Sequence, residues 1–130
     1  MFLNQLNLEE RKAFIELAYY TAKIDNVFAD EEKYFIETYK NEAGIEYYDI
    51  ENYDFDKIVS KFKNKRVKNI VLLEITALIY ADKKVTIEES NLLKDLQRKL
   101  NFTDEEMKAS EIWVKNYFEL LEQGSNFING

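Results

Sequence analysis

Apolar residues recur at intervals of three and four along most of the chain, which is the spacing of helices with one buried face. Six stretches carry this pattern, at residues 8–24, 30–43, 54–62, 67–81, 87–100 and 104–122. No stretch alternates apolar and polar residues around a hairpin dipeptide, so no strand is required. The pattern therefore predicts an all-α domain of about six helices.

Several of these stretches begin with residues that commonly cap helices. A Ser, Thr or Asn followed three residues later by Glu can form a capping box, in which two backbone amides are satisfied reciprocally. The chain also lacks proline, and Gly44 follows the second stretch, where a left-handed residue often ends a helix. The three candidate capping pairs are Asn7 with Glu10, Thr86 with Glu89, and Thr103 with Glu106.

The stretch at 70–81 is apolar almost all round, so we expect it to be the central and most buried helix, with Leu73 and Leu78 in the core. Its length of about 12 residues is well short of the roughly 20 that cross a bilayer, so no membrane span is expected. The last helix is expected to turn Trp113, Val114, Tyr117, Phe118 and Leu121 toward the core. Residues 125–130 are expected to form a flexible tail, which leaves residues 1–124 as a single domain.

An internal repeat is the most informative feature of the sequence. When the chain is shifted by 57 residues, residues 22–45 align with residues 79–102 without a gap. Each copy consists of a helix, a five-residue turn and a second helix. The repeat predicts two pseudo-symmetric helical hairpins that pack face to face, with the third and sixth helices completing a bundle.

Acidic residues gather in both turns, and two interpretations remain open. The carboxylates can bond amides of the turn and of the following helix, or they can ligate a hard cation. The EF-hand pattern fails in both copies, because the alternate loop positions lack ligands and the required glycine is missing. The structural interpretation is favoured, and any divalent cation site is expected to be weak. The candidate ligands are Asp25, Glu31, Glu32, Asp82 and Glu89.

Composition excludes several kinds of chemistry. The chain has no cysteine and no histidine, which removes disulfides, zinc fingers and catalysis by either side chain. With 25 acidic and 18 basic residues the net charge is −7, which argues against general nucleic-acid binding. Neighbouring first-turn glutamates point about 100° apart, so they do not form a paired-carboxylate site. We therefore expect a protein that is not an enzyme and has no cofactor.

Two charged segments could still meet a partner. Residues 57–68 carry six basic residues and no acidic one, which could hold an anionic partner or could simply be a solvated helix end and turn. Residues 46–56 combine acidic and aromatic side chains, either as a contact surface or as a connector whose tyrosines fold back onto the core. The candidate partner-binding residues of the basic segment are Lys61, Lys63, Lys65, Arg66 and Lys68.

The turn and the helix after it resemble the tellurite-resistance TerB-like family. That family's pattern runs A-x-x-D-G-x-[IV]-x-x-x-E and continues into a leucine-rich helix, as residues 80–103 do here. Asn26 and Lys83 replace the two motif glycines. The matching residues are Ala22, Asp25, Phe28 and Glu32 in the first copy, and Asp82, Val85 and Glu89 in the second.

The resemblance covers about residues 8–122 and implies a double helical hairpin without catalytic activity. It further implies a bacterial role in chemical-stress responses, in which an acidic surface binds cations or a protein partner. No basic segment precedes an apolar run at the start of the chain, so we expect a cytoplasmic location. The alternative hypothesis is a bacterial or phage accessory domain that binds an anionic partner through residues 57–68.

Overall fold

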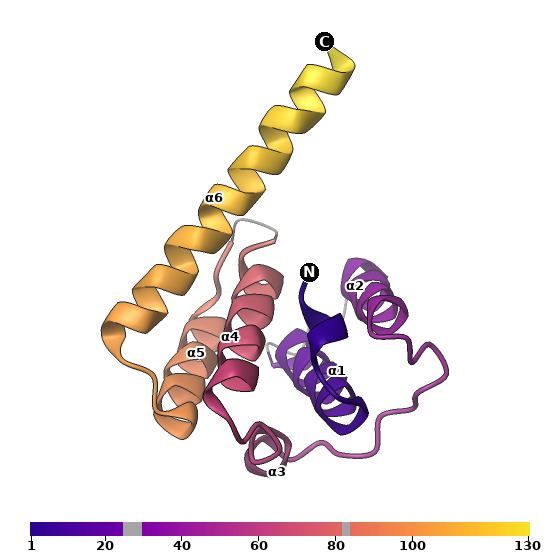
Figure 1. Cartoon of the computed structure of the whole chain (residues 1–130), viewed down its shortest axis with the longest axis vertical. Coiled ribbons are helices and arrows are strands. Elements are labelled where there is room, and N and C mark those ends of the chain that lie inside the picture. Colours follow the sequence, from indigo (N-terminus) through magenta and orange to yellow (C-terminus); the bar gives the residue numbers. More distant parts are fainter. Residues whose placement is uncertain (25–29, 82–83) are drawn as a thin grey trace.

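The computed structural model describes residues 1–24, 30–81 and 84–130. All regular secondary structure in this part of the chain is helical, which confirms the all-α class (Figure 1). A short 3-10 helix, η1 (Leu3–Gln5), precedes the α-helices. These are α1 (Leu8–Lys23), α2 (Asp30–Glu42), α3 (Phe55–Val59), α4 (Lys65–Tyr80), α5 (Ile87–Leu100) and α6 (Asp104–Asn129).

Helices α1 and α4 lie at the centre of the bundle. Helix α1 packs against α2, α3 and α4, whereas α4 packs against α1, α5 and α6. Figure 1 shows α6 running along the bundle and then standing clear of it over the second half of its length. None of the helices within the described ranges combines the length and apolarity needed to cross a bilayer.

The helix starts follow the sequence prediction closely. All three predicted capping boxes are present, so α1, α5 and α6 begin one residue after Asn7, Thr86 and Thr103. Asp54 and Asn64 cap α3 and α4 in the simpler way, each through a side-chain oxygen that accepts a backbone N–H three residues later. Local side chains therefore fix where the helices begin.

The repeat recurs in the backbone of the two helix pairs. Helices α1 and α4 begin and end 57 residues apart, and α2 and α5 begin 57 residues apart. Gly44 and Asn101 both adopt the left-handed conformation after the second helix, with φ of 72° and 61°. The next N–H, of Ile45 or Phe102, donates in each copy to a carbonyl five residues earlier, at 2.9 Å. The two copies thus share local structure, while their pseudo-symmetric packing stays a prediction.

Some predicted boundaries were wrong. Helix α3 is shorter than expected, and α4 begins two residues earlier because Asn64 caps it. Helix α6 was expected to end near residue 122 but continues to Asn129. No proline stops it, and Phe127 and Ile128 extend the helical spacing of apolar residues through Gly124. The flexibility expected of residues 125–130 stays a prediction.

The core is shared between two helices instead of centring on one. Helix α4 contributes nine buried residues and α1 contributes eight. Helix α4 was expected to be the most buried helix, and it exceeds α1 by one buried residue. Leu73 and Leu78 were expected in the core but are half-buried. Leu73 borders a shallow cavity between α4 and α6, and Ile75 is the fully buried residue beside it. On α6, Val114 is buried, whereas Trp113 and Leu121 are exposed, contrary to expectation.

We expect Ile75→Ala to lower the free energy of unfolding by about 2–5 kcal/mol, because it removes a fully buried side chain and leaves a cavity. Leu73→Ala is the matched control and should cost less, about 1–2 kcal/mol, because its side chain is only partly buried and borders a cavity. Urea unfolding followed by circular dichroism measures both losses. Equal losses at the two positions would contradict the described core.

Candidate functional site

The predicted acidic-turn site falls largely on residues that the structure leaves undescribed. Asp25 and Asp82 lie outside the described residues, as do the side chains of Glu31 and Glu32. Glu89 is described, and its carboxylate accepts the Thr86 backbone N–H at 3.0 Å as half of a capping box. Among the side chains that are described, no cluster of three potential metal ligands occurs. For Glu89 the geometry thus favours the structural interpretation.

The structure ties three of the five candidate basic residues to partners inside the chain. Lys65 Nζ lies 2.5 Å from a Glu106 carboxylate oxygen and 4.4 Å from the centre of the Phe102 ring. Arg66 donates to the Gln5 side chain, and Lys61 Nζ lies 3.9 Å from Glu16 Oε1. These contacts join α4 to α6 and η1, and the linker before α4 to α1.

A helix start is an unfavourable place for positive charge, because the helix dipole is positive there. Lys65 and Arg66 occupy the first turn of α4 and are held by groups from α6 and η1. The bond from Lys65 and the capping bond with Thr103 lower the pKa of Glu106. The basic segment therefore helps to assemble the bundle, and the remaining candidates are the exposed Lys63 and the half-buried Lys68.

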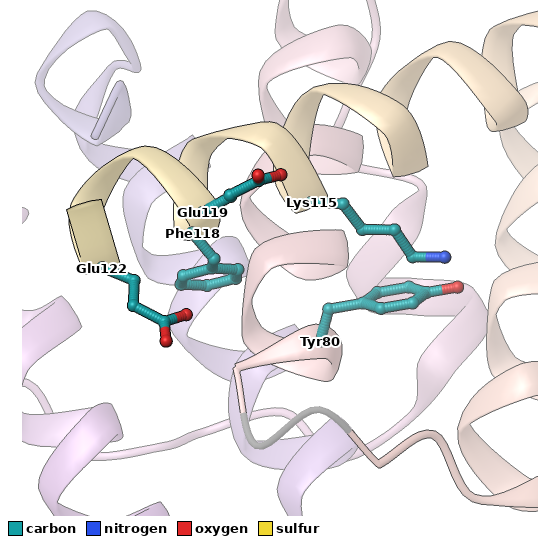
Figure 2. A pocket seen from close by; sticks show the side chains of 5 residues that line it. All are labelled: Tyr80, Lys115, Phe118, Glu119 and Glu122. Atoms are coloured by element: carbon teal, nitrogen blue, oxygen red, sulfur yellow. The ribbon is translucent and has the colours of Figure 1, made fainter.

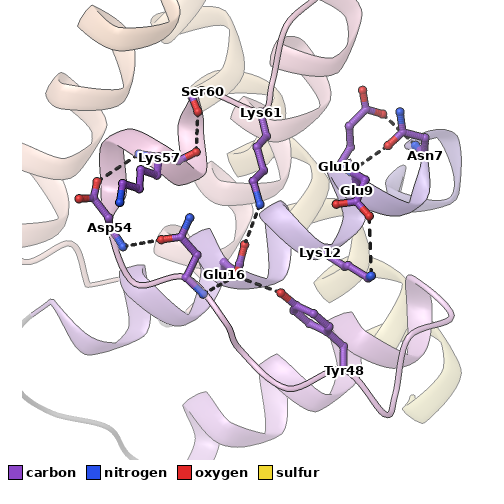
Figure 3. Close-up of polar contacts among 11 residues, drawn as sticks. Asn7, Glu9, Glu10, Lys12, Glu16, Tyr48, Asp54, Lys57, Ser60 and Lys61 are labelled. Atoms are coloured by element: carbon purple, nitrogen blue, oxygen red, sulfur yellow. Dashed lines mark hydrogen bonds and ion pairs between the residues drawn. The ribbon is translucent and has the colours of Figure 1, made fainter.

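Glu16 on α1 anchors the acidic and aromatic connector (Figure 3). Its side chain is buried, with only 1% of the residue exposed. One carboxylate oxygen accepts the Tyr48 hydroxyl at 3.0 Å and the Asn52 backbone N–H at 2.7 Å. Burial, followed by this bond, raises the pKa of the Tyr48 hydroxyl. Sequence reasoning missed Glu16, although its position within an apolar run of α1 was a signal.

Residues 46–56 were expected to be either a contact surface or a connector whose tyrosines fold back onto the core, and each interpretation describes only part of the segment. Tyr48 folds back onto the core as the connector interpretation predicted. Tyr47 and Tyr53 instead remain exposed, and the Tyr53 ring packs edge-on against Tyr19 at 5.9 Å. The connector therefore has one buried anchor and an exposed outer surface.

A second buried carboxylate, Glu74 on α4, holds the start of the chain. It accepts the Phe2 N–H at 2.7 Å and lies 3.0 Å from the Met1 ammonium, which Glu42 also binds. Burial alone would lower the pKa of that ammonium, but its bonds to the two carboxylates raise it overall. Burial, and then the charge of Glu74, also raise the pKa of the Tyr39 hydroxyl on α2.

Two cavities border Phe118 on the side of α6 that faces α4. One has a volume of about 320 Å³ and is lined by Tyr80, Lys115, Phe118, Glu119 and Glu122 (Figure 2). The other lies among α2, α4 and α6, and its lining includes Tyr39, Glu42, Glu74, Tyr117, Phe118 and Leu121. We call these two hollows the Phe118 cavities.

The Phe118 cavities combine aromatic rings with acidic side chains. Lys115 Nζ lies 2.8 Å from Glu111 and 5.4 Å from the centre of the Tyr80 ring. The bond between Lys115 and Glu111 lowers the pKa of Glu111 and raises that of Lys115. Both cations at the cavities, Lys115 and the Met1 ammonium, are thus already paired, and carboxylates outnumber them. Such a lining suits a group that is apolar with a positive end.

The Glu16 anchor is testable with neighbouring tyrosines. Glu16→Leu should lower the free energy of unfolding by about 2–4 kcal/mol, because it leaves the buried Tyr48 hydroxyl without its acceptor. Tyr48→Phe should cost about 1–2 kcal/mol, whereas Tyr47→Phe, at a residue that is 77% exposed, should change stability by less than about 0.5 kcal/mol. Chemical denaturation checks all three, and equal effects of the two tyrosine changes would contradict the anchor.

Comparison with known proteins found no relative of this chain. No family model, no curated protein and no solved structure matches the chain. The Phe118 cavities are accordingly interpreted from their own residues and charges.

Proposed function

We propose that this chain is a non-catalytic interaction module of the TerB-like kind, which acts in a bacterial chemical-stress response in the cytoplasm. Its partner is a protein segment that carries both apolar and basic side chains. The observation that carries this proposal is the pair of cavities on either side of one aromatic side chain, Phe118. A surface of this kind can bind apolar groups in its cavities, while the acidic side chains at its rim favour a partner that also carries positive charge.

The first cavity already shows the type of contact that a basic partner would make. The Lys115 ammonium sits over the face of the Tyr80 ring, and Figure 2 shows the Phe118 ring beside this pair. An incoming lysine or arginine can use the neighbouring Glu119 and Glu122 carboxylates while its apolar stem packs on Phe118. Aromatic faces stabilise cations most when water is partly excluded, as it is in a cavity.

The use of the described carboxylates supports a binding role over a catalytic one. Glu89 and Glu106 cap helices, and Glu16 and Glu74 hold chain segments against the core. General acid–base catalysis needs a carboxyl group that faces a substrate and has a tuned pKa. The inward-facing carboxylates Glu16 and Glu74 instead bind backbone amides, and Glu119 and Glu122 at the rim of the first cavity add negative charge there.

Peptides selected for binding test the proposed partner chemistry. From a displayed library of helical peptides, we expect the enriched sequences to combine Lys or Arg with large apolar residues, because of the acidic, aromatic lining. Phe118→Ala should weaken the best peptide at least about tenfold, the effect of losing one aromatic contact. The double variant Lys63→Ala/Lys68→Ala is the control and should bind as the wild type does.

Enrichment of acidic peptides, with binding lost in the lysine double variant, would contradict the cavity proposal. It would support the alternative that the basic segment holds an anionic partner. In that case binding to polyphosphate should also fall steeply as salt is raised, because phosphate neutralisation releases counterions.

Growth in the presence of tellurite tests the stress-response part of the proposal. Expression of the wild-type chain in a sensitive bacterium should raise the tolerated tellurite concentration. Phe118→Ala should abolish the gain, and Tyr47→Phe, an exposed change on the connector, should preserve it. If the wild-type chain left the tolerated tellurite concentration unchanged, the proposed stress role would be contradicted. The peptide selection would then still test the proposed partner chemistry.

A further inference from the structure

The second half of α6 carries large apolar side chains that nothing in the described structure covers. Leu120, Phe127 and Ile128 are 66%, 88% and 81% exposed, and Leu121 is exposed beside them. Figure 1 shows this part of α6 projecting beyond the other helices. Single exposed apolar residues are ordinary, but a continuous stripe of them marks an interaction surface.

The stripe has the spacing of a coiled-coil seam. Residues 113, 117, 120, 124 and 127 follow one another at intervals of four, three, four and three, which is the a/d pattern over two heptads. The seam starts on the bundle, where the Trp113 and Tyr117 rings stack at 5.4 Å and Trp113 lies 6.0 Å from Phe2. Beyond Tyr117 the stripe continues through Leu120 and Phe127, which stay exposed in the part of the chain that the structure describes. We call residues 113, 117, 120, 124 and 127, together with the flanking residues 121 and 128, the α6 seam.

Gly124 sits in the middle of the α6 seam, and contacts within the chain do not require it. Glycine weakens a helix interior relative to alanine, and a Cβ added here would have no atom within 4 Å. A small residue at a seam position lets a large residue of a facing helix fill the space. The open space at Gly124 therefore leaves room for a large side chain of a facing helix.

The chain's own α6 is complementary to this seam when the two helices run antiparallel. In that arrangement a positions face d positions of the partner, so Leu120 faces Gly124 and Tyr117 faces Phe127. In the two central layers the large Leu120 then packs on the small Gly124, and in the two outer layers the aromatic rings of Tyr117 and Phe127 pack on each other. A parallel pair would instead place Gly124 opposite Gly124 and leave a gap.

Charge along the seam also favours a second copy. The flanking positions are the uncharged Asn116 and Gln123 on one side, and the apolar Leu121 and Ile128 on the other. Glu119 and Glu122 occupy the outward positions, so two copies can meet without facing carboxylates. No basic residue follows Lys115, and the whole chain carries −7, which disfavours an anionic lipid surface.

We propose that α6 pairs with the α6 of a second copy of this chain, antiparallel, with Leu120 of each copy packed on Gly124 of the other. The seam offers on the order of 500 Å² per copy, with each aromatic side chain worth roughly 150–250 Å² when fully buried. The total of about 1,000 Å² is at the lower limit for a specific interface, so the dimer is weak and concentration-dependent. The proposal uses the seam instead of the Phe118 cavities and goes beyond the proposed function.

Sedimentation equilibrium of the full chain over a range of concentrations tests the dimer. The wild type should change from monomer to dimer as concentration rises, and Phe127→Glu should raise the dimer dissociation constant at least about tenfold. Tyr47→Glu is the matched control, because it makes the same kind of change at a residue that is 77% exposed on the connector. Both variants should keep the helical content of the wild type, and its unfolding midpoint at concentrations where the wild type is monomeric, because both positions are exposed in the monomer.

Single cysteines test the register, because the chain has none of its own. Under mild oxidation, a mixture of Leu120→Cys and Gly124→Cys should give mainly the mixed disulfide, and neither variant alone should cross-link as fast. Preferential cross-linking of Leu120→Cys to itself would overturn the antiparallel arrangement. A wild-type monomer at every concentration, or a dimer that Phe127→Glu leaves unchanged, would overturn the proposal whatever the peptide selection shows. Binding of wild-type monomer to vesicles of neutral lipid through the seam would also overturn it.

Discussion

The structure depends on two carboxylates that are buried in the bundle and must be compensated there. An ionised side chain removed from water is costly unless hydrogen bonds or opposite charges replace its hydration. One oxygen of Glu16 accepts from the Tyr48 hydroxyl and the Asn52 amide, and one oxygen of Glu74 binds the Phe2 amide and the Met1 ammonium. The second oxygen of each carboxylate is buried without a hydrogen-bond partner among the described residues, and that of Glu16 lies 3.9 Å from Lys61 Nζ. Through these bonds the two segments that are poorest in helix are fixed against the central helices α1 and α4, which gives the bundle a defined surface.

Helix α6 packs against the bundle over only part of its length. Its first half is fixed to α4 by apolar packing and by the pair between Lys65 and Glu106. Its second half extends past the bundle with its apolar residues exposed. One helix therefore carries two adjacent surfaces of different chemistry. The Phe118 cavities are aromatic and acidic and suit a basic, apolar partner, whereas the α6 seam is apolar and uncharged and suits another copy of itself.

The two surfaces together outline how such a module could work without catalysis. A weak, concentration-dependent dimer would present two sets of Phe118 cavities, so a partner with two binding segments would be held more tightly than one with a single segment. The shared helix also places the surfaces next to each other, since Leu121 lines a cavity and also flanks the seam. Tyr117 is likewise a seam residue that lines this cavity, so occupation of one surface can influence the other through these two side chains.

The sequence by itself determined the helical class, the starts of α1, α5 and α6, and the repeat of local structure. Capping boxes and the left-handed Gly44 act within a few residues, so local spacing is enough to reveal them, whereas the left-handed Asn101 was not predicted. Only the tertiary structure decided that Glu16 and Glu74 are buried, that Leu73 and Leu78 are only partly buried, and that Lys65 and Arg66 are paired. Each of these outcomes depends on which helix lies opposite, and a helical pattern shows that a face is apolar without showing what covers it. The same limit explains α6, where the apolar spacing predicted that Trp113 and Leu121 would face the core, whereas the structure leaves both exposed.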